Sequence, residues 1–275
     1  MSNAEPGSVD YRSRRSSTPK GPLWAAVIAV ILVVGIIAWY GLRSGPEPGP
    51  DRDLPDFPAD TVADDTFPEI APGTDVEPLD LPELEGSDAF VRDLVAGLSS
   101  HPQLARWLVT DGLIDRYVSV VLDLAGGSSP LEHVEFLRPE EDFRVRSGSG
   151  DRQTIDPESY QRWNLLAETF ASLDVEGTVR LHRQLRPLIE EAWEARGIPD
   201  MSFDHALARA LNTLRDAEIP RDPPEVVLVE GIWEFADPEL EALPGAQKAL
   251  IRMGPENADR IRAQVDALAV ELGLN

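Results

Sequence analysis

The feature that most constrains this chain of 275 residues is a run of eighteen uncharged residues at positions 23–40, LWAAVIAVILVVGIIAWY. As an α-helix this run is about 27 Å long, close to the ~30 Å hydrocarbon core of a bilayer. Trp24, Trp39 and Tyr40 lie at its two ends, where amphipathic rings favour the boundary between headgroups and acyl chains. The run therefore predicts a single transmembrane helix.

This helix is expected to remain in the mature protein. A secretory signal has an apolar region of about 7–15 residues, followed by small residues at its cleavage site. Here the run is longer, and bulky Trp39 and Tyr40 stand where a signal peptidase selects small side chains. A helix buried in a soluble core is the alternative, but polar segments flank the run on both sides. The pattern favours a retained anchor.

Basic residues predict the orientation of this anchor. Six of them flank the run: Arg12, Arg14, Arg15, Lys20, Arg43 and Arg52. Four precede the run and two follow it, and because Lys and Arg resist translocation, residues 1–22 are expected in the cytoplasm. In a Gram-negative cell the C-terminal part then lies in the periplasm, tethered to the inner (plasma) membrane. A weaker alternative keeps that part in the cytoplasm.

The next segment, residues 41–86, is predicted to be a disordered linker. Within it, residues 44–85 contain nine prolines and thirteen acidic residues, and the apolar residues stand singly. Such a composition cannot bury enough apolar surface to offset the entropy of ordering the chain. We interpret the linker as a spacer that projects a folded domain from the bilayer; an unselected solubilising tether is the alternative.

Charge and cysteine content exclude several functions. The chain carries a net charge of −24, with −12 on residues 44–85 and −15 on residues 86–275. Both acidic segments repel the phosphates of nucleic acids, so no nucleic acid is expected as a partner. The sequence has no cysteine, which excludes disulfides, thiolate catalysis and cysteine-ligated metals.

Residues 87–275 are expected to form one compact, mainly α-helical domain with a small β-hairpin or extended element. Apolar residues recur at helical spacing in nine stretches: 87–98, 104–108, 113–125, 156–173, 174–197, 202–214, 237–243, 244–253 and 255–272. Pro187 is expected to kink or break the fifth of these. Alternation at 143–147 and 153–155 predicts a hairpin, and 226–229 and 232–235 have the pattern of short extended segments.

Four stretches carry a resemblance to a known family: residues 155–160, 187–197, 235–241 and 247–257. Together they resemble a bacterial envelope family known as domain of unknown function 3014, over nearly all of residues 87–272. Trp193 stands where that family is expected to have tyrosine. The resemblance implies a short tail, one membrane helix, a Pro-rich linker and a single domain, and it brings no catalytic residues.

Candidate chemical groups have ordinary structural alternatives. His101, His133, His182 and His205 lack the spacing of metal ligands. The acidic pairs Glu190 with Glu191, and Asp237 with Glu239 and Glu241, have the residue types that glycoside hydrolysis requires. Such pairs also arise by chance among the 34 acidic residues of the domain, and Asp237 before a proline is typical of a helix cap.

Two further groups leave alternatives open. Lys248 and Arg252, near the Gly254-Pro255 step and Asn257, could form an anion site, a solvated ionic face or a helix junction. The helical phase places Trp107, Trp163 and Trp193 mostly on core faces. Trp233 is the least certain of the tryptophans, and could stack on a glycan or a peptide.

The sequence favours an envelope protein without enzymatic activity, which presents an acidic helical domain to another protein or to the cell wall. The alternative is a cell-wall glycan hydrolase that uses paired carboxylates. No catalytic, cofactor-binding or metal-binding residue is assigned, and the membrane is the one partner that the sequence predicts directly.

Overall fold

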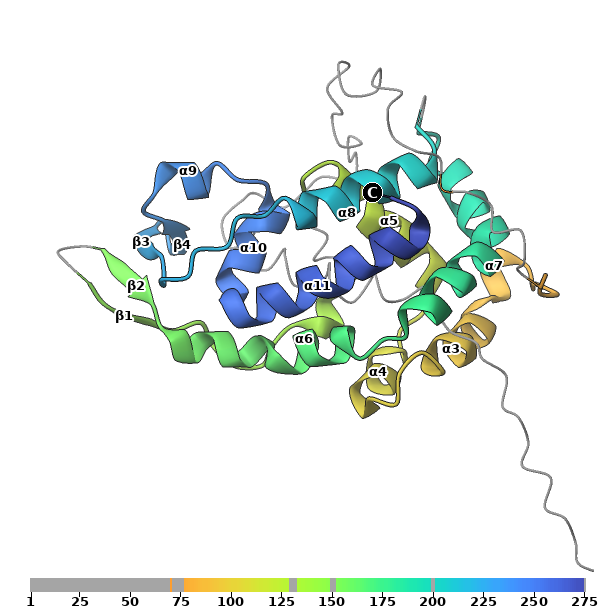
Figure 1. Ribbon diagram of the computed structural model, residues 1–275, viewed down its shortest axis with the longest axis horizontal. Helices are drawn as coiled ribbons and strands as arrows, with labels where there is room; N and C mark the ends of the chain where they lie inside the picture. The colour runs from red at the N-terminus through yellow and green to blue at the C-terminus, as the bar shows by residue number, and fades with distance from the viewer. Residues whose placement is uncertain (1–69, 71–76, 129–132, 149–151, 199–200, 275) are drawn as a thin grey trace, which may run out of the picture.

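The computed structural model describes residues 70, 77–128, 133–148, 152–198 and 201–274. The predicted tail, the transmembrane helix at 23–40 and most of the predicted linker lie outside these residues. Over the described ranges, no helix combines the length and the apolar character needed to cross a bilayer. The described domain is mainly helical, with a small antiparallel sheet at one end of its long axis (Figure 1).

Four amphipathic helices form the body of the domain: α5 (Leu113–Ala125), α7 (Val175–Glu194), α8 (Phe203–Arg215) and α11 (Pro255–Leu272). Helix α5 packs on α7 and α8, and α11 lies against both of these helices (Figure 1). The facing side chains are almost fully enclosed, with Tyr117, Val121 and Leu185 at most 1 % exposed. The predicted helical faces therefore enclose one large apolar core.

Shorter elements cover this core: η1 (Leu84–Gly86), α3 (Asp88–Ala96), α4 (Pro102–Trp107), η3 (Glu135–Leu137), η4 (Pro157–Trp163), α6 (Asn164–Ala171), α9 (Pro238–Glu241) and α10 (Gly245–Met253). The predicted cap at Asp237 is confirmed, because its side chain accepts a hydrogen bond from a backbone N–H in the first turn. Asp156 and Ser202 cap η4 and α8 in the same way. The turns after Asp156 form a 3₁₀-helix before α6 begins. The Ser87 hydroxyl donates to the carbonyl of Leu84 at 2.8 Å and does not cap α3.

Ordered structure begins before Ser87, within the segment predicted as linker. Leu79, Leu81 and Leu84 pack against the main core, and Ile70 is 1 % exposed. The amide of Gln184, on α7, donates to the carbonyl of Glu77 at 2.9 Å. These leucines stand singly in the sequence, so their local pattern is that of a linker, yet each finds apolar contacts on the helical body.

Helix α7 continues through Pro187 from Val175 to Glu194, so the predicted break does not occur. An interior proline removes one backbone hydrogen bond and costs about 3 kcal/mol in an isolated helix. In α7 the side chains on both sides of the proline are buried, with Leu185 and Ile189 both 0 % exposed. We attribute the continuity of the helix to this tertiary packing.

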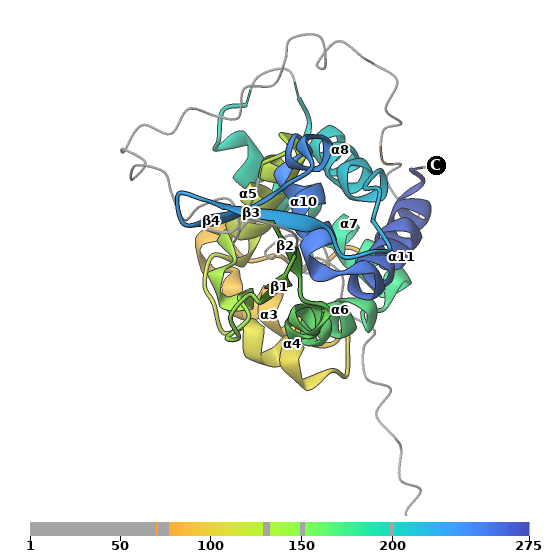
Figure 2. The same ribbon diagram turned by 90° about the vertical axis from the view of Figure 1, so that its left-hand side faces the viewer.

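The predicted hairpin and extended segments join into one antiparallel sheet in the order β1-β2-β3-β4: Val145–Ser147, Gln153–Ile155, Glu225–Val229 and Ile232–Phe235. Gln153 pairs with Val226, and Val226 pairs with Phe235. Viewed from the sheet end, the strands lie across that end of the domain, with the helices behind them (Figure 2). The sequence predicts the four segments but not the long-range pairing of β2 with β3.

At the junction of α10 and α11 the backbone packs so closely against Tyr160 that only glycine fits. Gly254 has φ +81° and is buried, and a β-carbon there would lie 2.5 Å from Cδ2 and 2.9 Å from Cβ of Tyr160. Backbone with this φ disfavours any side chain, and the Tyr160 ring leaves no room for one. The Gly254-Pro255 step is therefore a helix junction that packs on η4.

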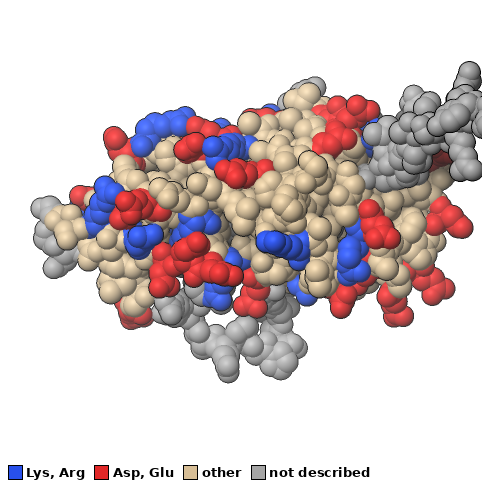
Figure 3. Space-filling model, turned by 90° about the horizontal axis from the view of Figure 1, so that it is seen from below, with Lys and Arg blue, Asp and Glu red and all other residues tan. Residues whose placement is uncertain are grey.

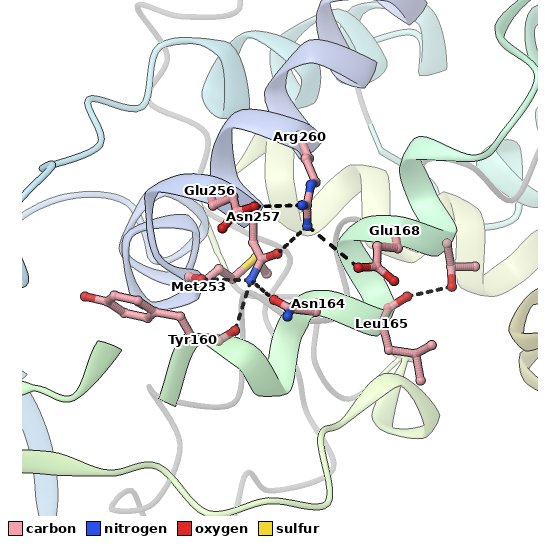
Figure 4. Close-up of polar contacts among 9 residues, drawn as sticks. Tyr160, Asn164, Leu165, Glu168, Met253, Glu256, Asn257 and Arg260 are labelled. Atoms are coloured by element: carbon pink, nitrogen blue, oxygen red, sulfur yellow. Dashed lines mark hydrogen bonds and ion pairs between the residues drawn. The ribbon is translucent and has the colours of Figure 1, made fainter. Parts of the chain in front are cut away.

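The buried side chain of Asn257 stabilises the same junction through hydrogen bonds (Figure 4). It is 2 % exposed, and its amide nitrogen lies 2.9 Å from the carbonyl oxygen of Tyr160, 3.0 Å from Oδ1 of Asn164 and 3.2 Å from the carbonyl oxygen of Met253. Arg260 lies beside it and pairs with Glu256 at 2.8 Å. These contacts assign Asn257 a structural role and leave no amide donor for an anion.

Replacing Gly254 with alanine is expected to lower the free energy of unfolding by about 3 kcal/mol, because it adds a steric clash to an unfavourable φ. Gly273→Ala is the control for positive φ alone, because Gly273 has φ +84° and ψ 15° and no atom lies within 4 Å of its β-carbon position. The control should cost about 1 kcal/mol. Urea unfolding of the protein in mild detergent measures both values, and equal losses would contradict the steric role of Tyr160.

Candidate functional site

The sheet extends beyond the helices that cover it. Val226 and Phe235 pair across β3 and β4 and are buried in a small second core, at 0 % and 3 % exposure. Side chains two residues apart share one face of a strand, so the next pair on this face is Leu228 with Trp233. Leu228 is 56 % exposed and Trp233 is only partly buried. The core-facing side of the sheet thus presents apolar surface to solvent at the β3–β4 end.

Trp233 lines a groove of about 860 Å³, which we call the Trp233 groove. Its other lining residues come from η3 and the segment between η3 and β1, from Gly231 and Ile232 at the β3–β4 turn, and from η4 through Arg162. Phe143 supplies a second aromatic side chain to this lining. The volume lies within the range of about 300–1,000 Å³ that is usual for ligand sites. The sequence singles out Trp233 as a stacking residue, but Phe143 and Arg162 escape notice because they lie far from it in the chain.

Arg162 is held inside the groove by aromatic rings. Its guanidinium carbon lies 5.3 Å from the ring centroid of Phe143 and 5.0 Å from that of Trp163, both within the range of a cation–π interaction. Its Nη1 also donates to the carbonyl of Glu141 at 3.4 Å. Arg162 thus connects the segment before β1 to η4 and fixes the position of Phe143.

Side chains close the outer edge of β4. The N–H of Phe235 donates to Oε2 of Glu241 at 2.8 Å, and Arg252 donates to the carbonyl of Trp233 at 3.0 Å. The Lys248 ammonium lies 2.6 Å from Oε1 of Glu241. Arg252 is 5 % exposed, and its guanidinium carbon lies 4.4 Å from the ring centroid of Phe235. The predicted alternatives of an anion site or a solvated ionic face are replaced by a partly buried ionic cluster that caps a strand edge.

Three of the five candidate carboxylates for glycan hydrolysis, Glu190, Asp237 and Glu241, are engaged in other contacts. Glu190 binds Arg186 at 2.5 Å, and Glu191, its exposed neighbour, lines neither the Trp233 groove nor the smaller cavity between α7 and α8. Asp237 accepts the N–H of Glu239 at 2.9 Å as a helix cap, and Glu241 closes the edge of β4. The structure brings no two of these carboxylates together across the Trp233 groove.

This smaller cavity, of about 450 Å³, lies between α7 and the start of α8 and is lined in part by Arg186, Trp193 and Asp204. Arg186 pairs with Asp204 at 2.9 Å, and hydrogen bonding to Glu190 together with the charge of Asp204 raises the pKa of Arg186. The predicted core position of Trp193 is confirmed, since it is 7 % exposed and packs edge-on against Phe203. The Arg186–Asp204 pair connects α7 to α8.

His182, at the base of this cavity, is buried among aromatic rings. It lies 3.3 Å from the hydroxyl of Tyr117, and its ring is tilted against Phe203. Burial, reinforced by the nearby charges of Arg186 and Arg183, lowers the pKa of His182 to about 3. Burial also raises the pKa of Tyr117. Both groups are therefore neutral near pH 7 and act as a packed, hydrogen-bonded pair.

Within the described ranges, no three His, Asp or Glu side chains gather in a way that could hold a metal ion. The fold and its grooves define a mainly helical domain with a small antiparallel sheet and an open groove, which is lined by charged residues and two aromatic side chains. The chain belongs to the family of proteins of unknown function DUF3014, which matches residues 113–269. That range includes both cavities and the whole sheet. No curated protein and no solved structure matches the chain.

The buried histidine predicts a measurable pH dependence. Because unfolded histidine binds a proton near its ordinary pKa of 6.5 and His182 does so only near 3, its contribution to stability is complete above pH 6.5 and is lost as the pH falls toward 3. The loss is about 2 kcal/mol at pH 5. Urea unfolding at pH 7 and pH 5 should show that His182→Gln removes this component. His205→Gln controls for the loss of a histidine, and an unchanged difference in His182→Gln would argue against the assignment.

Proposed function

We propose that this protein is an inner-membrane-anchored envelope protein that binds a partner in the periplasm and catalyses no reaction. The observation that carries the proposal is the Trp233 groove, where apolar sheet surface remains uncovered beside a second aromatic residue. A partly uncovered apolar face at a groove is typical of an interaction site. The binding partner is another envelope protein or the cell wall.

The sequence before the domain supports the location. The uncharged run at residues 23–40 has the length of a bilayer span, and the basic residues before it favour a cytoplasmic N-terminus. The acidic, Pro-rich segment that follows favours an extended spacer, because proline and like charges stretch a chain. A binding domain on such a spacer reaches partners away from the bilayer surface.

The geometry gives the hydrolase alternative less support. A glycosidase requires two carboxylates about 5–10 Å apart across a cleft, one of them with a raised pKa. Glu190 and Glu241 are bound to basic side chains, and Asp237 caps a helix. None of the candidate carboxylates lines the Trp233 groove.

The location is tested by fusing alkaline phosphatase, which is active only in the periplasm, after Asn275. We expect activity in intact cells, because the basic tail favours a cytoplasmic N-terminus. A fusion with Arg12, Arg14, Arg15 and Lys20 changed to glutamate is the matched control and should lose much of that activity. An inactive fusion of the unaltered chain that is nevertheless produced in full would place the domain in the cytoplasm and overturn the proposed location.

The absence of catalysis is tested with purified cell-wall glycan. We expect the full protein in detergent to release no soluble sugar above a heat-inactivated sample, because none of the candidate carboxylates lines the Trp233 groove. Glu191→Ala and Asp237→Ala serve as matched variants. Turnover by the unaltered protein that either substitution abolishes would favour the hydrolase instead.

A further inference from the structure

We propose that the Trp233 groove binds an extended polypeptide segment in which one large apolar side chain is flanked by lysine or arginine. The inference rests on the proposed function and names the chemistry of the partner. Its observations are separate from those for the anchor: the apolar part of the groove, the sign of the charges around it, and the closed edge of β4.

The apolar part of the groove fits a single large side chain. Trp233 from β4 and Phe143 from the segment before β1 line the same space, and each is partly buried. Leu228 pairs with Trp233 across the strands and is 56 % exposed. An aromatic or aliphatic side chain seated here would cover this surface, and such anchors supply most of the affinity at interfaces.

The charges around that space select cations. Four acidic residues line the groove, Glu135, Glu140, Glu141 and Asp142, against the two arginines Arg138 and Arg162. The Arg162 guanidinium already lies near the rings of Phe143 and Trp163. The groove is therefore net negative, and it belongs to a domain that carries −15. Lysine or arginine beside the apolar anchor would complement this field and speed association.

The closed edge of β4 sets the mode of binding. Glu241 and Arg252 occupy the outward N–H of Phe235 and the outward carbonyl of Trp233, so a partner cannot add a strand there by backbone pairing. Recognition must come from side chains in the groove. A neutral glycan could stack on Trp233 but would gain nothing from the excess of carboxylates, so a cationic peptide is favoured.

The test uses the full protein in lipid nanodiscs and three fluorescent nine-residue peptides. The first has a central tryptophan flanked by lysines, the second replaces the lysines with glutamates, and the third replaces the tryptophan with alanine. Fluorescence anisotropy should show that the first binds at least about tenfold more tightly than either of the others. Its affinity should fall as salt is raised, because the flanking charges are exposed.

Two variants locate the binding. Trp233→Ala removes the apolar wall, and Glu140→Lys with Glu141→Lys reverses the field at surface positions where folding is not at risk; each should weaken the first peptide about tenfold. Asp93→Lys with Glu191→Lys makes the same change of charge on α3 and α7 and should leave the affinity unchanged. Equal binding of the three peptides, no binding of the first, or full affinity in the Glu140–Glu141 variant would overturn the inference. None of these outcomes bears on the phosphatase or turnover tests, so failure here leaves the proposed function standing.

Discussion

The contact between Gly254 and the ring of Tyr160 is the constraint on which the arrangement of the domain depends. It allows α10 to end and α11 to begin directly against η4, the element that follows β2. Asn257 then reaches from α11 to the carbonyl of Tyr160 and to Asn164. Through these contacts the helical body holds the segment that carries Arg162, and hence one side of the Trp233 groove. A side chain at position 254 would push the α10–α11 junction away from η4.

The fold was predictable where its signals are local. Residues 113–125 form a helix with the expected ends because Gly112 and Gly126 bound a periodic apolar run. The caps at Asp156 and Asp237 follow from residue type and the proline after each. The joining of four short strands was beyond local reasoning, since Gln153 and Val226 lie far apart in the chain. The contacts of Leu79 and Leu81 were beyond local reasoning for the same reason, because both residues are solitary in the sequence and pack on the distant helical body.

The site was only partly predictable. Trp233 was recognised as a tryptophan outside any clear helical face, but its partners depend on the tertiary fold. The turn that presents it is also unusual, because Glu230 adopts φ +51° beside Gly231 at φ +91°. Two-residue hairpin turns with positive φ favour Asn-Gly or Asp-Gly, so Glu-Gly gives a weak signal. The charged residues near Arg252 have the spacing of a solvated helix face, and spacing alone does not show that Arg252 is buried. In the space-filling view, basic and acidic side chains are interspersed over the face shown (Figure 3).

The hydrogen bond from Gln184 to Glu77, together with the buried Ile70, fixes where the chain enters the helical body. That entry lies beside α7, whereas β3 and β4 lie at the opposite end of the long axis (Figure 1). In the tethered protein that we propose, a pull between the membrane and a partner held at Trp233 would therefore run along this long axis, from η1 and α7 to the sheet. The contacts of Leu79 and Leu84 with the helical body and the contacts of the partner with the groove would then carry the same load, and the weaker of the two sets would yield first.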